Sequence, residues 1–344
     1  MKYKTNRMLI MLAVLSLFSF SCKYSPCAIL EDSSEETVVQ CLKAGPKEDI
    51  LLIPEVKAYL SKHKVYISLT TSPLRISKIL PVLETLDLEF VENILLVLPV
   101  KFSRDGSEYV IPKEIKDFPK VKILRIEKDL GPITKLLPAI VYVNHSAENE
   151  KAGIVITTEE PVLTPDPSPD PDAIVITVDD DTGYFRGSIS QLIKYNILEN
   201  AVVSRTAVEF SDYKIPEEFW PQSIRKQPEA SVEGLVARDI VEGWGGIAYR
   251  AKHVAVRKMS KLSALGKICN SADDLVISWI LDYELVPRFE VINMYIERPI
   301  QFSFGFEKDA LHKGVGDGSN VGGVPARDYA ACAKIATETV QFNF

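Results

Sequence analysis

Apolar residues occur along the first half of the chain in short, nearly continuous runs that are separated by helical patterns. Runs at 64–69, 93–100 and 121–126 are rich in β-branched and aliphatic side chains and predict strands. Between the first two, apolar residues recur every three or four positions over 76–86, which predicts a helix. A second helix is predicted at 133–142, after Pro132, and a further strand at 173–178.

Strands that alternate with helices in this way predict an α/β fold with a mostly parallel central sheet and helices on both faces. The run 94–98 is apolar without interruption, as expected for a strand that is buried on both faces. In such sheets ligands bind beyond the carboxyl ends of the strands. The segments 70–75, 129–135 and 179–181 follow predicted strands, so functional residues are expected there.

Composition and charge restrict the function only weakly. Hydrophobic residues make up 46% and charged residues 25% of the 344 residues, as in an ordinary folded protein. The formal net charge of −7 argues against a general nucleic-acid-binding protein, which usually has a basic face. A nucleotide diphosphate is not excluded, because one cation and a few local groups can hold it.

The N-terminus has the order of a secretory signal. Basic residues within 1–7 precede the apolar run 8–20, and Cys22 follows. The run is shorter than the roughly 20 residues that a membrane-spanning helix needs. Residues 1–21 are therefore expected to be a cleaved signal peptide, a short membrane anchor or the leader of a protein lipidated at Cys22. These three alternatives imply an exported or membrane-associated protein, which is lumenal if the host is eukaryotic. A buried N-terminal helix is the remaining alternative.

Two further segments lack the periodicity of helices or strands. Residues 22–60 begin polar and acidic and are interpreted as a leader or stalk. Residues 159–172 alternate prolines with acids, which favours an extended, exposed insertion, since a strand follows at once. The five cysteines match no zinc-binding pattern, and Cys27 and Cys41 could form a bridge or remain free.

The most informative motif is the acidic triplet 179–181, which directly ends the strand 173–178. In an extended chain, residues two apart share a side, so Asp179 and Asp181 are expected to face one point while Asp180 faces away. Two converging carboxylates without His or Cys beside them suit Mg²⁺ or Mn²⁺. The alternative is an acidic loop that stabilises the start of the next helix.

Five blocks of sequence together resemble glycosyltransferases of the GT-A fold, especially family 2-like members. The block VDDD at 178–181 is similar to their DXD site, and SLTTSPLR at 68–75 to their first strand and nucleotide-binding loop. DLGPITKL at 129–136 resembles a block that recurs in one branch of these enzymes. GWGGIAYR at 243–250 is similar to their Gly-rich acceptor-side strand, and ADDL at 272–275 to the acidic pair that includes a general base.

The resemblance covers roughly residues 64–290 and implies a domain organisation and an activity. It implies a Rossmann-related, nucleotide-sugar-binding half at 61–210, an acceptor half at 211–300 and a C-terminal segment at 301–344 that could close over the donor. The implied reaction is the metal-dependent transfer of a sugar from a nucleotide diphosphate sugar to an acceptor hydroxyl, with inversion. A glycan, a lipid and a protein remain open as acceptors.

The residue types and the resemblance together give an expected site. Asp179 and Asp181 are expected to bind the cation, with His312 as a third ligand from the C-terminal segment. Lys135 follows a strand at a helix start, where a cation and backbone N–H groups can meet a phosphate. The groups expected to bind the nucleotide sugar are Thr70, Thr71, Arg75, Asp129, Lys135, Gly245 and Gly246.

The acidic pair at 273–274 is expected to supply the catalytic base. Asp274 is favoured over Asp273 to take the proton of the acceptor hydroxyl, and one of the two could instead only cap the helix that begins there. Two other functions remain open. One is another metal-dependent nucleotide-processing enzyme, although the sequence has no Gly-rich phosphate loop followed by Lys. The other is an exported binding module without turnover.

Overall fold

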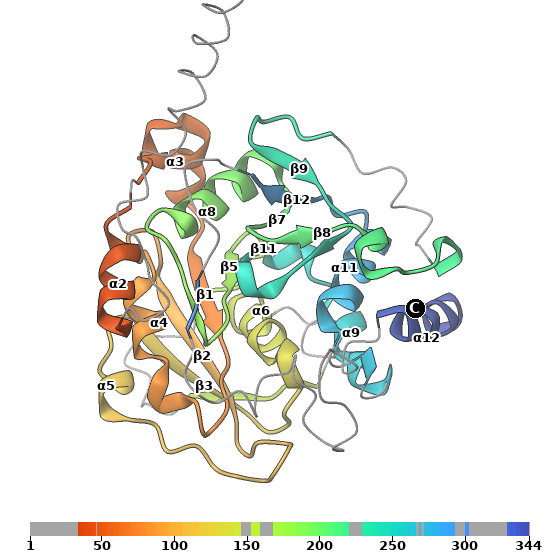
Figure 1. The fold of residues 1–344 in the computed structure, drawn as a ribbon, viewed down its shortest axis with the longest axis horizontal. Coiled ribbons are helices and arrows are strands. Elements are labelled where there is room, and N and C mark those ends of the chain that lie inside the picture. The colour runs from red at the N-terminus through yellow and green to blue at the C-terminus, as the bar shows by residue number, and fades with distance from the viewer. Residues whose placement is uncertain are drawn as a thin grey trace, which may run out of the picture.

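The computed structural model describes residues 34–45, 47–145, 153–158, 168–219, 229–265, 268–269, 272–292, 300–302 and 329–343. Within these residues nine strands form one mixed sheet in the order β4-β3-β2-β1-β5-β11-β7-β12-β9, with helices packed around it (Figure 1). The expected signal segment 1–21 and the C-terminal residue His312 lie outside the described residues.

The four strands that the sequence predicts form the parallel part of the sheet. These are β1 (Val65–Leu69), β2 (Asn93–Pro99), β3 (Val121–Ile126) and β5 (Ile174–Thr177). Strand β1 lies between β2 and β5, and β2 also pairs with β3. The α/β fold with a largely parallel sheet core is therefore confirmed.

The rest of the sheet is mixed. Strand β11 (Ile247–Arg250) is antiparallel to both β5 and β7 (Val202–Ser204), and β12 (Arg288–Val291) is parallel to β7. The edge strands β4 (Ile156–Thr158) and β9 (Leu235–Ala237) are antiparallel to their neighbours. Two small ribbons pair β8 (Ala207–Val208) with β10 (Ile240–Val241), and β6 (Thr182–Gly183) with β13 (Ile300–Gln301).

Alternate residues of the central strands enter two hydrophobic clusters, one on each face of the sheet, because successive strand side chains point to opposite faces. One face is covered by α2 (Glu35–Lys43), α3 (Pro54–Leu60), α4 (Leu80–Thr85), α5 (Lys113–Lys116) and α8 (Ser188–Glu199). The other face is covered by α6 (Leu137–Val143), α9 (Val256–Met259), α11 (Asp273–Tyr283) and α12 (Tyr329–Asn343).

Short 3-10 turns connect many of these elements. They are η1 (Ile50–Leu52), η2 (Ile76–Lys78), η3 (Gly131–Lys135), η4 (Phe210–Tyr213), η5 (Glu217–Phe219), η7 (Gly243–Gly245), η8 (Ala251–His253) and η9 (Ser260–Leu265).

Residues 35–60 differ from the expected leader or stalk. They form α2, η1 and α3, and they contribute Val38, Leu42, Ile50 and Val56 to the core. Helix α2 begins after Ser34, whose hydroxyl accepts a hydrogen bond from the backbone N–H of Thr37 at 3.3 Å. Helix α2 has a short apolar face among polar residues, and this face is hard to recognise in the sequence. The interpretation as a loose leader is therefore wrong for this segment.

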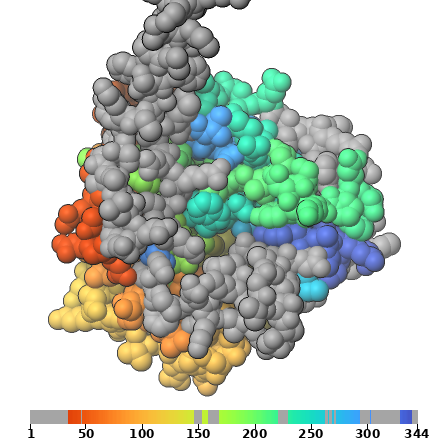
Figure 2. All heavy atoms as spheres, in the orientation of Figure 1, coloured from red at the N-terminus to blue at the C-terminus, as the bar shows by residue number. Residues whose placement is uncertain are grey.

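A disulfide joins the C-terminal helix to the segment that precedes α11. It links Cys269 to Cys332 on α12, and Cys41 is also disulfide-bonded. Tyr329 at the start of α12 stacks on Tyr213 of η4, with ring centroids 3.8 Å apart, and Figure 2 shows α12 against the surface of that region. In the described ranges no helix combines the length and the apolar character that a membrane crossing requires.

Candidate functional site

The acidic triplet lies in a turn at the carboxyl end of β5. Asp180 was expected to face away from the point that Asp179 and Asp181 share. Its side chain instead lies inside the site, and the residue is only 7% exposed. Its carboxylate accepts a hydrogen bond from Thr71 Oγ1 at 2.5 Å and pairs with Arg75 Nη2 at 3.0 Å. The expectation is wrong because residues 180 and 181 leave the extended conformation, so the alternation of strand side chains does not continue past β5.

The two predicted metal ligands each pair with a cation of the chain. Arg75 Nη2 lies 2.6 Å from Asp181 Oδ2, and Lys135 Nζ pairs with Asp179 Oδ1. The structure thus brings the loop after β1, η3 and the triplet together, as the sequence predicts. Among the described residues, no cluster of three or more His, Cys, Asp or Glu side chains that could hold a metal ion is found.

Burial and charge act against each other in this cluster. Burial raises the pKa of Asp180 to about 7, although the Arg75 guanidinium favours the carboxylate. Burial also disfavours the charged form of Arg75, but Asp180 and Asp181 outweigh it and raise the pKa of the guanidinium. Arg75 therefore favours the carboxylate form of Asp180 against the effect of burial, and its guanidinium joins Asp180 and Asp181 in one network.

Thr71 and Asp129, which were expected to bind the nucleotide, form hydrogen bonds that stabilise loops. Besides donating to Asp180, Thr71 accepts a hydrogen bond at its backbone oxygen from the hydroxyl of Tyr109, at 2.9 Å. Asp129 accepts hydrogen bonds from the backbone N–H groups of Ser103 and Gly131 at 2.9 and 2.8 Å. Asp129 thus fixes the loop that leads into η3, while Thr70 is half-buried at the end of β1.

The Gly-rich segment before β11 lies beside these acids. Gly245 and Gly246 were expected to bind the nucleotide sugar, but a Cβ on Gly245 would lie 2.3 Å from Thr206 Oγ1. Gly246 has a φ of +84°, which favours glycine for the backbone alone. The close approach at Gly245 is therefore made by the chain itself, whereas Gly246 is required by its backbone conformation. Gly243, which the sequence analysis did not single out, is the glycine that borders Lys135 and Asp274.

The acidic pair begins α11 and is almost buried. Asp273 and Asp274 are 7% and 8% exposed, and the N-cap position belongs to Ala272, so neither acid is the N-cap. Asp274 Oδ1 accepts a hydrogen bond from the backbone N–H of Gly243 at 3.2 Å. Burial disfavours the charge of Lys135, yet Asp179, Asp273 and Asp274 raise its pKa above the ordinary value. The acidic triplet and the acidic pair thus both act on Lys135.

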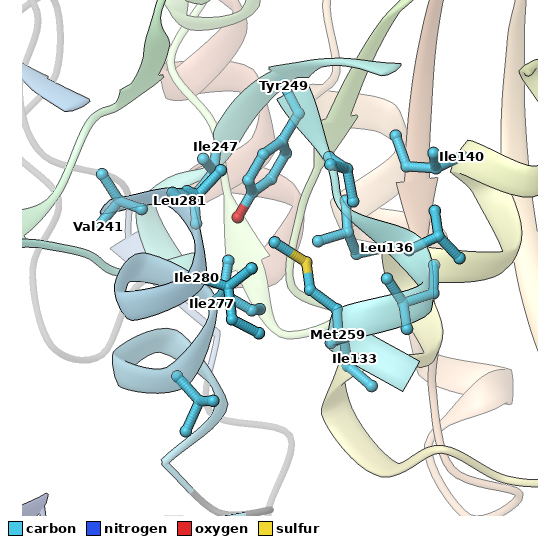
Figure 3. Close-up of a cluster of buried hydrophobic side chains, with 14 of the residues drawn as sticks. Ile133, Leu136, Ile140, Val241, Ile247, Tyr249, Met259, Ile277, Ile280 and Leu281 are labelled. Carbon is cyan, nitrogen blue, oxygen red and sulfur yellow. The ribbon is translucent and has the colours of Figure 1, made fainter. Parts of the chain in front are cut away.

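A hydrophobic cluster packs against the elements that carry the site. Tyr249 of β11 lies among apolar side chains of α11, α9, η3 and α6, and Figure 3 shows these groups meeting at one place. The labelled residues are Ile133, Leu136, Ile140, Val241, Ile247, Tyr249, Met259, Ile277, Ile280 and Leu281. Because all four elements share this core, the backbones that carry Lys135 and Asp274 are held in fixed relative positions.

Tyr184 is a further site residue that the sequence analysis missed. Its hydroxyl accepts a hydrogen bond from the backbone N–H of Asp179 at 3.1 Å and donates to the backbone oxygen of Trp244 at 3.3 Å. It connects the acidic triplet to the Gly-rich segment. Its position shortly after the triplet gives no pattern from which this role could be read.

Comparisons with known proteins do not assign the chain to a family. No protein-family model matches it, and a search of curated proteins finds no significant match. The sheet and the arrangement of charged groups therefore carry the functional argument.

Proposed function

We propose that the protein is a glycosyltransferase that uses a nucleotide diphosphate sugar and a divalent cation, Mg²⁺ or Mn²⁺. The observation that carries the proposal is a cluster of carboxylates around two cationic side chains where the parallel strands end. Five aspartates (Asp179, Asp180, Asp181, Asp273 and Asp274) interact with two cationic side chains, Arg75 and Lys135. Like charges held this close together resist joint ionisation, so the cluster favours a ligand that brings further positive charge.

The topology supports the finer assignment to the GT-A fold. The parallel strands β3, β2, β1 and β5 supply a nucleotide-binding half whose carboxyl ends carry the acids. Strand β11, which follows the Gly-rich segment, lies beside β5 and brings the acceptor half next to the same edge. This is the juxtaposition that the sequence resemblance implies for a donor site and an acceptor site.

The chemistry of the donor atoms fits a hard divalent cation. Asp179 and Asp181 offer carboxylate oxygens, and Mg²⁺ is commonly held by one or two protein carboxylates together with substrate phosphates and water. His312 remains a proposed third ligand outside the described residues. When bound, such a cation offsets the negative charge that develops on the departing diphosphate.

The remaining steps belong to the chain's own residues. Arg75 and Lys135 supply positive charge to the diphosphate, and Thr70 and Thr71 line the nucleotide loop. Asp274 accepts the proton of the acceptor hydroxyl while that oxygen forms a bond to the anomeric carbon. The bond from the anomeric carbon to the diphosphate oxygen breaks, and its electron pair leaves with the nucleoside diphosphate.

The disulfide supports export as part of the same proposal. Disulfides form and persist mainly in oxidising compartments, and the bond between Cys269 and Cys332 joins two buried residues in the acceptor half and C-terminal helix. A secreted, lumenal or membrane-anchored enzyme would fold there. Mass spectrometry of protein from its native host would find the mature N-terminus near Cys22 if residues 1–21 are removed.

The decisive experiment measures metal-dependent binding and hydrolysis. Purified protein is tested with UDP-glucose, UDP-galactose, UDP-N-acetylglucosamine and GDP-mannose, with Mn²⁺, with Mg²⁺ and with a chelator. Asp181→Ala is expected to weaken metal-dependent binding by about 100-fold or more, which corresponds to about 2.7 kcal/mol. The variant should still fold, because Arg75 keeps its ion pair with Asp180.

The matched control is Asp117→Ala, since Asp117 has a side chain that is 64% exposed, at the end of α5. It should bind as the wild type does. Equal affinity with and without metal, in wild type and Asp181→Ala alike, would contradict the proposal. Tight metal-dependent binding of a nucleotide sugar without any turnover would instead identify an exported binding module.

A further inference from the structure

We propose that Lys135 is a positioning residue that links the donor-side acid Asp179 to the acceptor-side acid Asp274, and that this link requires glycine at position 243. The proposal deepens the proposed function and rests on it. It adds a role for Lys135 beyond contact with phosphates, and it assigns a role to Gly243.

Lys135 lies between the two acids. Its side chain is 13% exposed, and its Nζ pairs with Asp179 Oδ1. A Cβ built on Gly243 would lie 2.8 Å from that Nζ and 3.3 Å from Asp274 Oδ1. The ammonium and the Asp274 carboxylate therefore border the same small space, which exists because residue 243 has no side chain.

The backbone gives no reason for glycine at this position. Gly243 begins the turn η7 and is not among the glycines with positive φ, whereas Gly246 in the same segment is. Alanine could therefore adopt the conformation of Gly243, so the observed contacts point to room for the Lys135 side chain as the constraint. The backbone N–H of Gly243 also holds Asp274 Oδ1 at 3.2 Å, so one residue positions the acid and admits the lysine.

Electrostatics favour the same arrangement. A buried ammonium is costly, and in this site Asp273 and Asp274 act on Lys135 together with Asp179. The backbones of η3 and α11 rest on one hydrophobic cluster, through Ile133 and Ile277 among others (Figure 3). With both backbones fixed, the lysine side chain is the adjustable part that sets how Asp274 lies relative to the donor acids.

The experiment is a double-mutant cycle of Gly243→Ala and Lys135→Met, followed by two measurements. The first is the rate of hydrolysis of whichever of UDP-glucose, UDP-galactose, UDP-N-acetylglucosamine and GDP-mannose the wild type turns over, with donor affinity measured in parallel. The second is the equilibrium constant for unfolding in urea. Lys113→Met serves as the control for loss of a lysine, because the Lys113 side chain is 88% exposed.

Gly243→Ala is expected to lower turnover about tenfold or more and donor affinity by a smaller factor, because the new methyl group displaces the mobile end of Lys135 but leaves Arg75 and Asp179 intact. In Lys135→Met the same alanine should have almost no further effect on turnover or unfolding, since its target is gone. Independent, multiplicative effects of the two changes on either quantity would overturn the proposal. If the wild type turns over no donor but the unfolding effects are non-additive, the proposed function fails and the Lys135–Gly243 contact stands.

Discussion

The two ends of the central sheet both carry charged side chains, but only one of them gathers five acids around two cations. At the carboxyl ends of the parallel strands, five aspartates interact with Arg75 and Lys135. At the opposite end, Asp172 pairs with Lys252 at 2.6 Å and with Arg250 at 3.7 Å. Beside this pair, His63 Nδ1 lies 3.0 Å from Asp170 Oδ1.

The two ends differ in how their charges are arranged, as separate ion pairs at one end and as a cluster of acids around two shared cations at the other. At the amino ends the acids have basic partners that tie the starts of β1 and β5 to the end of β11. Such pairs hold chain segments together and need no ligand. At the carboxyl ends five acids instead act on the same two cations, Arg75 and Lys135, and a bound metal ion would stabilise such a cluster further. Changes at the amino ends of the strands should therefore affect stability, and changes at the carboxyl ends should affect function.

The largest effect is expected from Asp274→Asn. This change keeps the size of the side chain and an oxygen that can accept from the N–H of Gly243. It removes the group that takes the acceptor proton, so turnover of the nucleotide sugar should fall by about 100-fold or more while donor affinity stays nearly unchanged. Single-turnover kinetics with donor binding measured in parallel would test this.

Asp273→Asn is the internal comparison, and it should have the milder effect of the two. If both variants react at the wild-type rate, the catalytic base lies elsewhere and the cluster of acids has a different role. A loss of donor affinity as large as the loss of rate would place Asp274 in the donor site instead.

A smaller effect, on stability alone, is expected at the other end from His253. Burial first, and then Arg250 and Lys252, lower the pKa of His253 to about 4. The unfolded chain therefore binds a proton near pH 6.5 that the folded chain does not, so stability should fall as the pH falls from about 6.5 to 4. A shift of this size corresponds to about 3 kcal/mol.

The test compares urea unfolding of the wild type and His253→Phe at pH 7 and pH 4.5. The variant should lose less stability than the wild type between the two values. An identical pH dependence of the two proteins would show that His253 does not contribute. Donor affinity at pH 7 should be the same in both, since this end of the sheet is remote from the proposed chemistry.

The smallest effect is expected from Asp172→Asn, which breaks the ion pairs with Lys252 and Arg250. The side chains of Asp172 and Lys252 are 29% and 39% exposed, so the pairs should contribute only about 0.5–1 kcal/mol. Urea unfolding should report this loss, and it should shrink at high salt. Metal-dependent donor binding should not change; a clear loss of binding would end the distinction between the two ends.

Prolines explain where the predicted helices differ from the structure. The expected helix 76–86 is divided into η2 and α4, and Pro81 stands at the start of α4. The expected helix 133–142 begins as the 3-10 turn η3, and α6 starts anew with Pro138 near its first position. Proline lacks the N–H that a continuous helix needs and fits its first turn, so each helix restarts there.

Local patterns were enough to locate the parallel strands and the triplet that ends β5. Strand β3 covers 121–126 as predicted, and β1, β2 and β5 differ from their predicted ranges by a residue or two, because continuous apolar runs are a strong local signal. The start of α11 at Asp273 was likewise visible as acids before an apolar helix.

Partnership between distant residues was not visible in any local pattern. Lys135 and Asp179 are 44 positions apart, and Asp274 belongs to yet another segment. Their meeting depends on the order of strands in the sheet and on the hydrophobic cluster that holds η3, β11 and α11 together. Periodicity records which face of an element is apolar, but it contains nothing about which side chains a neighbouring element will present. Only the packed chain places one lysine between two groups of acids and leaves room for it beside Gly243.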